Sequence, residues 1–226
     1  MQQRIFNEDK NKYYAASAAL PGISLYFKAK LFEFFDYDIE AFWKCDSPDL
    51  KEFSLKNPDV RVSRTFLSAK SKINPELEYK NALEKGYKIL GYEDENYPEL
   101  LKQIPDFPLM LYYKGSFEGI NLKRTLAIVG SRKASENAKE SLAKIISQMQ
   151  NTDVTIVSGL AYGIDAKAHE SAIKNGLKTI GVIGSGLDFE YPSSNKNLYR
   201  RIEEGSGVVI SEFAPSIAPV ARNFPQ

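Results

Sequence analysis

From Tyr87 to the end of the chain, short apolar runs alternate with longer stretches that have the spacing of amphipathic helices. The candidate strands are residues 87–90, 109–113, 126–129, 154–157, 179–183 and 207–211. The runs at 126–129, 154–157 and 179–183 are almost continuously apolar, which is typical of parallel strands covered on both faces. Strand–helix–strand units of this length predict an α/β fold: a Rossmann-like parallel sheet flanked by helices, with right-handed crossovers.

Two of the helices between these strands have recognisable ends. Ser135 is placed to cap the first helix, and Glu136 and Glu140 lie near its positive end. Its expected apolar stripe consists of Ala138, Leu142, Ile145, Ile146 and Met149. The second helix starts near Gly163 and stops at Asn175-Gly176, because glycine readily adopts the left-handed conformation that ends helices.

The first 80 residues have the pattern of a small all-helical domain. Leu20-Pro21-Gly22-Ile23 is a turn, and the apolar positions after it predict a helix buried on a broad face: Leu25, Phe27, Leu31, Phe32, Phe34 and Phe35. A Pro-Gly turn also joins helices in helix-hairpin-helix modules, which contact DNA backbone. A domain that only packs, with Phe42 and Trp43 in its core, is the favoured interpretation. We expect two domains, at residues 1–80 and 81–226.

Composition excludes several classes of protein. The 226 residues are 43% hydrophobic, yet no apolar run approaches the roughly 20 residues that span a bilayer. Residues 1–7 lack the apolar core of a signal peptide. The single cysteine, Cys45, excludes an internal disulfide framework and a zinc site built on several thiolates. We expect a cytoplasmic protein that does not bind membranes.

Overall charge does not indicate a nucleic-acid-binding protein. The formal net charge is +1, with 17 Lys and Arg against 19 Asp and Glu in residues 1–119 and 13 against 10 in the remainder. A site for a polyanion must therefore come from a few well-placed cations together with backbone amides.

Three glycine-containing turns follow predicted strands. Residues 158–169 read Ser-Gly-Leu-Ala-Tyr-Gly-Ile-Asp-Ala-Lys-Ala-His, and shorter turns occur at Gly130-Ser131-Arg132 and Gly184-Ser185-Gly186. Glycine lets a backbone come close to a ligand, and a helix N-terminus presents free N–H groups to an anion. The carboxyl ends of parallel strands meet at one edge of a sheet, so the turns predict a shared phosphate-binding crevice.

Two side chains near these turns have alternative interpretations. Arg132 can fork to a phosphate or stack on a base, or it can form a salt bridge at the start of a helix. Lys133 beside it is expected in solvent. Phe224, in a Pro-rich segment, either stacks on a base or anchors the loop.

The sequence does not favour an enzyme. Ser158, Asp165 and His169 suggest a nucleophile and its relay, but Asp165 and His169 lie four residues apart on one helix, where they can pair or cap. His169 is expected to be a partly buried, hydrogen-bonded imidazole. No Walker motif occurs, and Gly184-Ser185-Gly186 lacks the complete dinucleotide-binding pattern. We expect no catalytic residue, metal or cofactor.

A set of motifs in fixed order resembles the DNA-processing protein A family, also called DprA or Smf. The resemblance runs from about Gly86 to the last residue. It is carried by Tyr97-Pro98, Ile104-Pro105-Asp106, Leu111-Tyr112, Val129-Gly130-Ser131-Arg132, residues 158–169, Gly184-Ser185-Gly186-Leu187-Asp188, Tyr191-Pro192, Ser211-Glu212-Phe213 and Asn223-Phe224-Pro225. The first 80 residues are loosely similar to that family's sterile-alpha-motif-like or helix-hairpin-helix-like region.

The resemblance implies an extended Rossmann-like domain that binds single-stranded DNA and loads RecA recombinase onto it during natural transformation, in a protein that forms homodimers. The DNA-binding residues that the resemblance and the turn chemistry together imply are Gly130, Ser131, Arg132, Ser158, Gly159, Leu160, Ala161, Gly163, Asp165, Gly184, Ser185, Gly186, Arg222, Asn223 and Phe224. The family pattern continues past Pro225 into an Arg-Asn-Arg segment and further strands. We therefore expect a chain truncated at its C-terminus, with weaker DNA binding than a full-length relative.

The alternative is a nucleotide-sensing or nucleotide-hydrolysing protein of the lysine-decarboxylase-like superfamily, which has a related fold. That group carries a Pro-Gly-Gly-x-Gly-Thr-x-x-Glu motif, and residues 181–186 of this chain provide neither its threonine nor its glutamate. Glu212, at a strand end, is the carboxylate to follow under this alternative.

Overall fold

The computed structural model describes residues 8–223, which divide between Leu111 and Tyr112 into two compact units. This division falls inside strand β2 (Met110–Gly115), whereas composition places a domain boundary between residues 80 and 81. The sequence-based boundary stays a prediction. Each unit is described below by itself.

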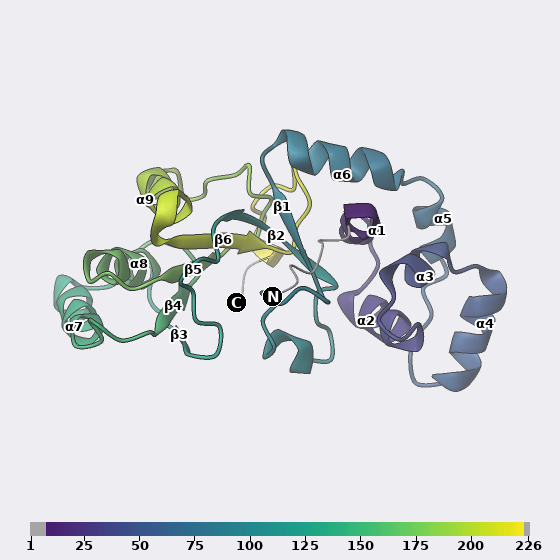
Figure 1. Cartoon of the computed structure of the whole chain (residues 1–226), viewed down its shortest axis with the longest axis horizontal. Coiled ribbons are helices and arrows are strands. Elements are labelled where there is room, and N and C mark those ends of the chain that lie inside the picture. The colour runs from purple at the N-terminus through teal and green to yellow at the C-terminus, as the bar shows by residue number, and fades with distance from the viewer. Residues whose placement is uncertain (1–7, 224–226) are drawn as a thin grey trace, which may run out of the picture. The chain divides into compact units, whose positions relative to one another are not determined.

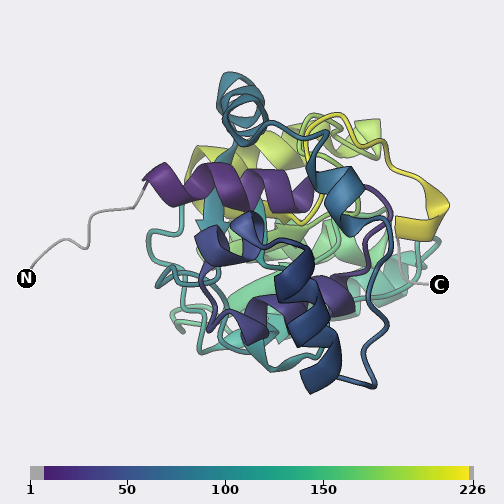
Figure 2. The same ribbon diagram turned by 90° about the vertical axis from the view of Figure 1, so that its right-hand side faces the viewer.

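The first unit begins with helices whose starts are visible in the sequence. Their bounds are α1 Glu8–Ala18, α2 Leu25–Phe34, α3 Ile39–Lys44, α4 Ser47–Lys56, α5 Phe66–Lys70 and α6 Pro75–Glu84. Ser24 caps α2 by accepting from the Phe27 N–H at 3.2 Å, and Asp46 and Asp49 form a capping box at α4. The prediction of a helical N-terminal region is confirmed (Figure 2).

Aromatic rings fill the core of this helical region. Phe27 contacts Phe53 and Phe66 edge-on, with ring centroids 5.8 and 5.5 Å apart. Phe42 and Trp43 are both buried, as predicted. Edge-on pairs of this kind contribute about 0.5–1.5 kcal/mol each beyond the burial of their area, so the helices are held mainly by packing.

All six predicted strands are present. They are β1 Lys88–Gly91, β2 Met110–Gly115, β3 Thr125–Ala127, β4 Thr155–Ser158, β5 Thr179–Val182 and β6 Gly207–Ser211, in the sheet order β1-β2-β6-β5-β4-β3 (Figure 1). Short 3₁₀ segments are η1 Leu101–Gln103, η2 Ser193–Asn195 and η4 Ala221–Asn223, and a kinked turn, η3 Ile202–Ser206, leads into β6. Mixed α/β architecture is therefore confirmed.

The expected parallel sheet is confirmed for β3, β4, β5 and β6, and β2 departs from it. Strands β3, β4, β5 and β6 are parallel, but β2 runs antiparallel to β6, with Tyr112 opposite Ser211 and Gly115 opposite Val208. Hydrophobic periodicity shows that a segment is a strand and not which way it runs. The direction of β2 is decided by its pairing with β6, which lies far along the chain, and local periodicity contains no information about that partner.

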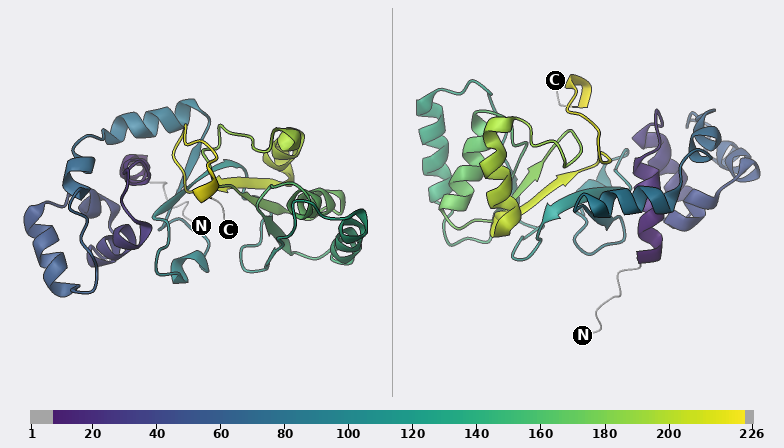
Figure 3. Two further views of the ribbon diagram at one scale, coloured as in Figure 1. Left: turned by 180° about the vertical axis from the view of Figure 1, so that it is seen from behind. Right: turned by 90° about the horizontal axis from the view of Figure 1, so that it is seen from above.

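Three helices cover one face of the parallel strands. They are α7 (Glu136–Ser147), α8 (Ile164–Lys174) and α9 (Lys196–Arg201). Figures 1 and 3 show them in one layer. Because the strands follow one another in chain order across the sheet, crossovers of a single hand place every connecting helix on the same side.

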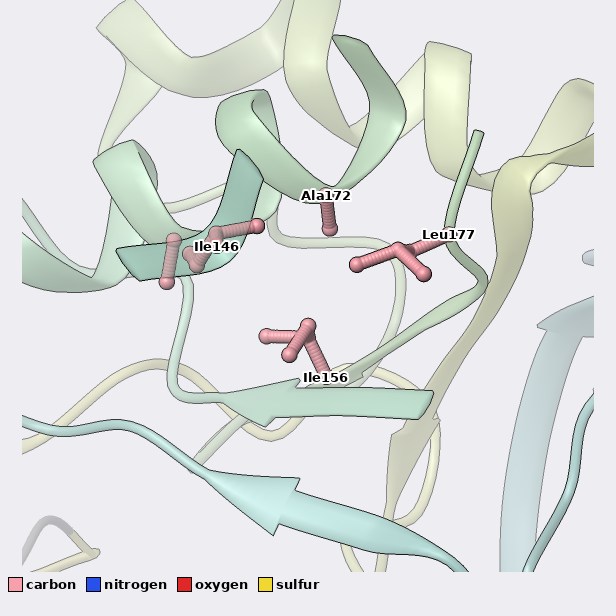
Figure 4. Packing of buried hydrophobic residues seen from close by; sticks show 5 residues of the cluster. Ile146, Ile156, Ala172 and Leu177 are labelled. Carbon is pink, nitrogen blue, oxygen red and sulfur yellow. The ribbon is translucent and has the colours of Figure 1, made fainter. Parts of the chain in front are cut away.

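The core between this layer and the sheet is compact. Ile146 of α7, Ile156 of β4, Ala172 of α8 and Leu177 point toward one another (Figure 4), and each is at most 4% exposed. Leu142 and Met149 pack against the cluster, as predicted. Ile145, which the sequence pattern assigned to the same stripe, is 52% exposed, because the buried stripe of α7 is narrower than the apolar pattern.

The described residues contain no helix that is both long and apolar enough to cross a membrane.

The neighbours Ile146 and Ile145 provide a matched test of this core. Ile146→Ala should lower the free energy of unfolding by about 2–5 kcal/mol, since it removes buried methylenes and leaves a cavity. Ile145→Ala should change the free energy by less than about 0.5 kcal/mol. Urea denaturation measures both. Equal losses for the two variants would contradict the packing described here.

Candidate nucleic-acid interface

The three glycine-containing turns lie at the carboxyl ends of neighbouring strands. Gly130-Ser131-Arg132 follows β3, residues 158–163 follow β4, and Gly184-Ser185-Gly186 follows β5. Strands β3, β4 and β5 are adjacent and parallel, so the turns occupy one edge of the sheet.

The turns after β3 and β4 are in direct contact. The Ile164 N–H donates to the Ser131 carbonyl at 3.3 Å. Gly163 has φ +80°, and a Cβ there would collide with the same carbonyl oxygen. Gly163 is therefore required by the close approach of two protein segments.

Asp165, in the first turn of α8, joins these segments electrostatically. Asp165 is 7% exposed, and the backbone N–H groups of Ala161, Gly130 and Gly159 lie close enough to its carboxylate to lower its pKa. Burial raises the pKa of Asp165 above its ordinary value, while the three N–H groups and the positive charge of Arg132 act in the opposite direction. An internal carboxylate thus occupies amides that a phosphate was expected to use.

Position 159 is a glycine because the carboxylate of Asp165 fills the space that a side chain there would occupy. A Cβ on Gly159 would lie 2.8 Å from Oδ2 of Asp165, which is closer than side chains tolerate. A larger residue at position 159 would push the carboxylate out of its ring of amides. The glycine turns predict close approach of DNA backbone or tight internal packing at Gly159; the space beside it is taken by Asp165, and contact with DNA there stays a prediction.

Several predicted DNA-binding residues are buried and support the turns from inside. Ser158 Oγ donates to the Ile128 carbonyl at 2.6 Å, and Ser211 Oγ donates to the Ser185 carbonyl at 2.6 Å. Leu160 has φ +57° and is fully buried. The Gly186 N–H donates to the Ile217 carbonyl at 2.8 Å. Of the predicted residues, four therefore shape the edge from inside and are not available as contact surface: Ser158, Leu160, Ser185 and Gly186.

The exposed members of the predicted set are Gly130, Ser131 and Arg132. The Ser131 hydroxyl accepts from the Lys133 N–H at 3.1 Å, which tightens the turn. Arg132 lies close enough to Asp165 to lower the pKa of that carboxyl. This position is compatible with both interpretations of Arg132, since an exposed guanidinium can balance Asp165 and still contact a phosphate.

The end of the described chain returns to the same edge. Asn223 Nδ2 donates to the Gly184 carbonyl at 3.1 Å, so the structure brings Asn223 to the third glycine turn. The side chain of Arg222 and all of Phe224 lie outside the described residues, and their predicted roles stay predictions.

The arrangement of Ser158, Asp165 and His169 is not that of a catalytic triad. His169 is fully buried, and its Nδ1 lies 2.7 Å from Thr179 Oγ1, which donates to the Ile156 carbonyl at 2.8 Å. Burial lowers the pKa of His169 to about 4, with the Ser158 backbone acting the other way. The imidazole is therefore neutral at pH 7 and belongs to the core.

The Cys45 thiol is also poorly suited to act as a nucleophile. Burial raises the pKa of the Cys45 thiol to about 11, so the reactive thiolate is scarce at neutral pH. Within residues 8–223, no group of three or more His, Cys, Asp and Glu side chains is placed to hold a metal ion.

Sequence reasoning missed two tyrosines at this edge. Tyr162, in the turn after β4, is 47% exposed, and Tyr191, in the loop after β5, is 51% exposed. Both lie close in sequence to the glycine turns. An aromatic residue inside a segment of small and polar residues was the signal that could have identified them.

A groove of about 530 Å³ lies elsewhere, over the outer surfaces of α7, α8 and α9. Its lining includes Lys144, Lys167, Glu170, Lys174 and Arg201, and none of the predicted DNA-binding residues. Lys144, Lys174 and Arg201 stand in the last turns of their helices, where a positive charge complements the helix dipole.

Comparison with known proteins decides the family. The sequence model of the family described as DNA recombination-mediator protein A matches residues 88–226. The chain belongs to this family. The predicted resemblance is therefore confirmed.

Members of the family match over most of this chain. DNA processing protein DprA of Streptococcus pneumoniae is 38% identical over 170 residues, which cover 75% of this chain and 57% of that protein. Protein Smf of Synechocystis is 30% identical over 216 residues, covering 94% of this chain and 53% of the relative. The chain thus spans about half the length of these curated relatives.

Solved structures agree with the fold. The X-ray structure of DprA from Streptococcus pneumoniae superposes with a TM-score of 0.74 at 31% identity, covering 95% of this chain and 71% of that one. DprA from Helicobacter pylori, whose structure is described as giving insight into a unique single-stranded DNA binding mode, superposes with a TM-score of 0.54 at 28% identity. That match covers 61% of this chain and 60% of the other.

Replacing Asp165 should destabilise this recombination-mediator domain. Asp165→Ala removes the buried carboxylate that interacts with the N–H groups of Ala161, Gly130 and Gly159, and losing a hydrogen bond to a charged group costs about 1.5–3 kcal/mol. The midpoint of urea denaturation should fall clearly. Glu170→Ala, an exposed carboxylate on the same helix, is the control and should leave the midpoint nearly unchanged. A wild-type midpoint in Asp165→Ala would refute the role assigned to this carboxylate.

The buried imidazole predicts a specific pH dependence. The unfolded chain takes up the proton near pH 6.5 and the folded protein only near pH 4. The stability associated with neutral His169 is therefore complete above pH 6.5 and is lost as the pH falls toward 4, by on the order of 3 kcal/mol. His169 is the only histidine, so NMR can follow its ring directly. An inflection near pH 6.5 in the folded protein would disprove the burial argument.

Proposed function

We propose that this chain binds single-stranded DNA along the sheet edge formed by the ends of β3, β4 and β5, without acting as an enzyme. The observation that carries the proposal is the gathering of three glycine turns at one edge, with Arg132 exposed among them. The family to which the chain belongs, and the single-stranded DNA described for the Helicobacter pylori relative, support the same ligand.

Phosphate binding at this edge rests on Arg132 and on the amides that remain. The N–H groups of Gly130 and Gly159 point at Asp165, so a phosphate would meet the exposed guanidinium of Arg132 first. A guanidinium offers two parallel donors to a phosphate. The positive charge of Arg132 also offsets the repulsion between the phosphate and the negative charge of Asp165.

The partners of the longer protein belong to the same proposal. We propose that it delivers single-stranded DNA to RecA recombinase in the cytoplasm during natural transformation, and that it acts as a homodimer. The family description as a recombination mediator supports the first point. The internal hydrogen bonds of Ser158 and His169 support a binding function in place of a hydrolytic one.

Arg132→Ala should weaken binding to single-stranded DNA of every sequence. The slope of log affinity against log salt should become shallower by about 0.7, because one phosphate contact is lost. Arg132→Lys should restore only part of the affinity, since an ammonium group cannot fork to two oxygens. Fluorescence anisotropy with a labelled oligothymidylate at several salt concentrations measures both effects.

The matched control is Arg124, at the opposite end of β3, where it forms an ion pair with Asp153. Arg124→Ala should leave affinity and slope unchanged. Equal losses in the two variants would place the DNA elsewhere. Turnover of a free nucleotide by the purified wild-type chain would contradict the non-enzymatic assignment.

A further inference from the structure

Asn195, at the end of the 3₁₀ segment η2, braces the turn that follows β4. Its Nδ2 donates to the Leu160 carbonyl at 2.9 Å and to the Ala161 carbonyl at 3.3 Å. A side-chain amide carries two N–H donors, which matches these two acceptors. The partners lie 35 and 34 residues apart along the chain, so this brace is a contact of the folded domain and belongs to no local motif.

The support from which Asn195 acts is anchored in the core. The Asn195 N–H donates to the Pro192 carbonyl at 2.9 Å. Asn195 directly precedes α9, in which Leu198 and Tyr199 are buried. Tyr199 Oη also donates to the Tyr191 carbonyl at 2.8 Å. The segment on both sides of Asn195 is therefore fixed, and the side-chain amide can hold the neighbouring turn in one place.

The turn after β4 has a backbone that needs such a brace. Leu160 has φ +57°, a conformation that is unfavourable for residues other than glycine unless their surroundings hold it. The Leu160 side chain is fully buried, and its Cδ1 occupies the space where Gly181 of β5 has no side chain. Core packing thus holds the side chain of Leu160, and Asn195 holds its carbonyl.

A movement of this turn is transmitted to Arg132. The Ile164 N–H donates to the Ser131 carbonyl at 3.3 Å. A Cβ at Gly163 would lie 2.9 Å from the carbonyl carbon of Arg132, so the two backbones meet without room for a side chain. Closely packed segments transmit displacement to each other. Asn195, on a separate loop, therefore acts on the position of Arg132 through the turn after β4.

We propose that Asn195 is a positioning residue for DNA binding. It fixes the turn after β4, and through that turn it keeps the backbone of Arg132 where the guanidinium meets a phosphate. This inference rests on the proposed function and adds a residue outside the three glycine turns. A contact that is held in place before binding loses less conformational freedom when the ligand arrives, so the loss of Asn195 weakens binding without removing a phosphate contact of its own.

Asn195→Ala removes both donors without a change of charge. Its affinity for a labelled oligothymidylate should fall about five- to tenfold, which corresponds to one hydrogen bond. Asn195→Ser, which keeps one shorter donor, should lose less. The matched control is Asn175→Ala, because Asn175 Nδ2 donates to the Ser171 carbonyl at 2.8 Å at the other end of α8. This control should bind DNA as the wild type does. Urea denaturation verifies that each variant is folded under the conditions of the titration.

A double-mutant cycle separates positioning from general support of the fold. In the Arg132→Ala background, Asn195→Ala should change the affinity by less than about twofold, because the side chain that it positions is gone. A double variant that loses the product of the two separate factors would refute the positioning role. If the wild type binds no oligonucleotide, the proposed function fails. If the wild type binds and folded Asn195→Ala binds equally tightly, only the inference about Asn195 fails.

Discussion

The buried carboxylate of Asp165 is the interaction on which the candidate site depends. Burying a charge is costly unless hydrogen bonds and an opposite charge compensate for it. Here the N–H groups of Gly130, Gly159 and Ala161 and the nearby guanidinium of Arg132 provide that compensation. Because the donors come from the turns after β3 and β4, one side chain fixes both turns and sets the position of Arg132.

The residues at this edge of the sheet are of two kinds: some face inward and support the turns, and others face outward into solvent. Ser158, Leu160 and Ser185 face inward and hold the turns through hydrogen bonds and packing. Arg132 and Tyr162 face outward. A glycine turn at the end of a strand therefore need not give its amides to the ligand. Its amides can interact with a carboxylate of the protein, and the loop then presents its outward-facing side chains to solvent.

An edge with an exposed guanidinium, Arg132, and an exposed aromatic ring, Tyr162, offers two kinds of contact that depend differently on solution conditions. A guanidinium attracts phosphate through charge, and that attraction weakens as salt increases. Aromatic faces attract bases through stacking, which salt hardly affects.

The sequence by itself determined the elements of this protein and its family. Apolar runs marked all six strands, Ser135 marked the start of α7, and the glycine motifs marked the turns at the ends of β3, β4 and β5, because each of these signals is local in the chain. Tertiary structure alone decided that β2 runs antiparallel to β6, that Ile145 is exposed beside a buried Ile146, and that Asp165 takes the amides of Gly130 and Gly159. Those outcomes depend on which segments meet in space, and neither hydrophobic period nor motif spacing contains that information.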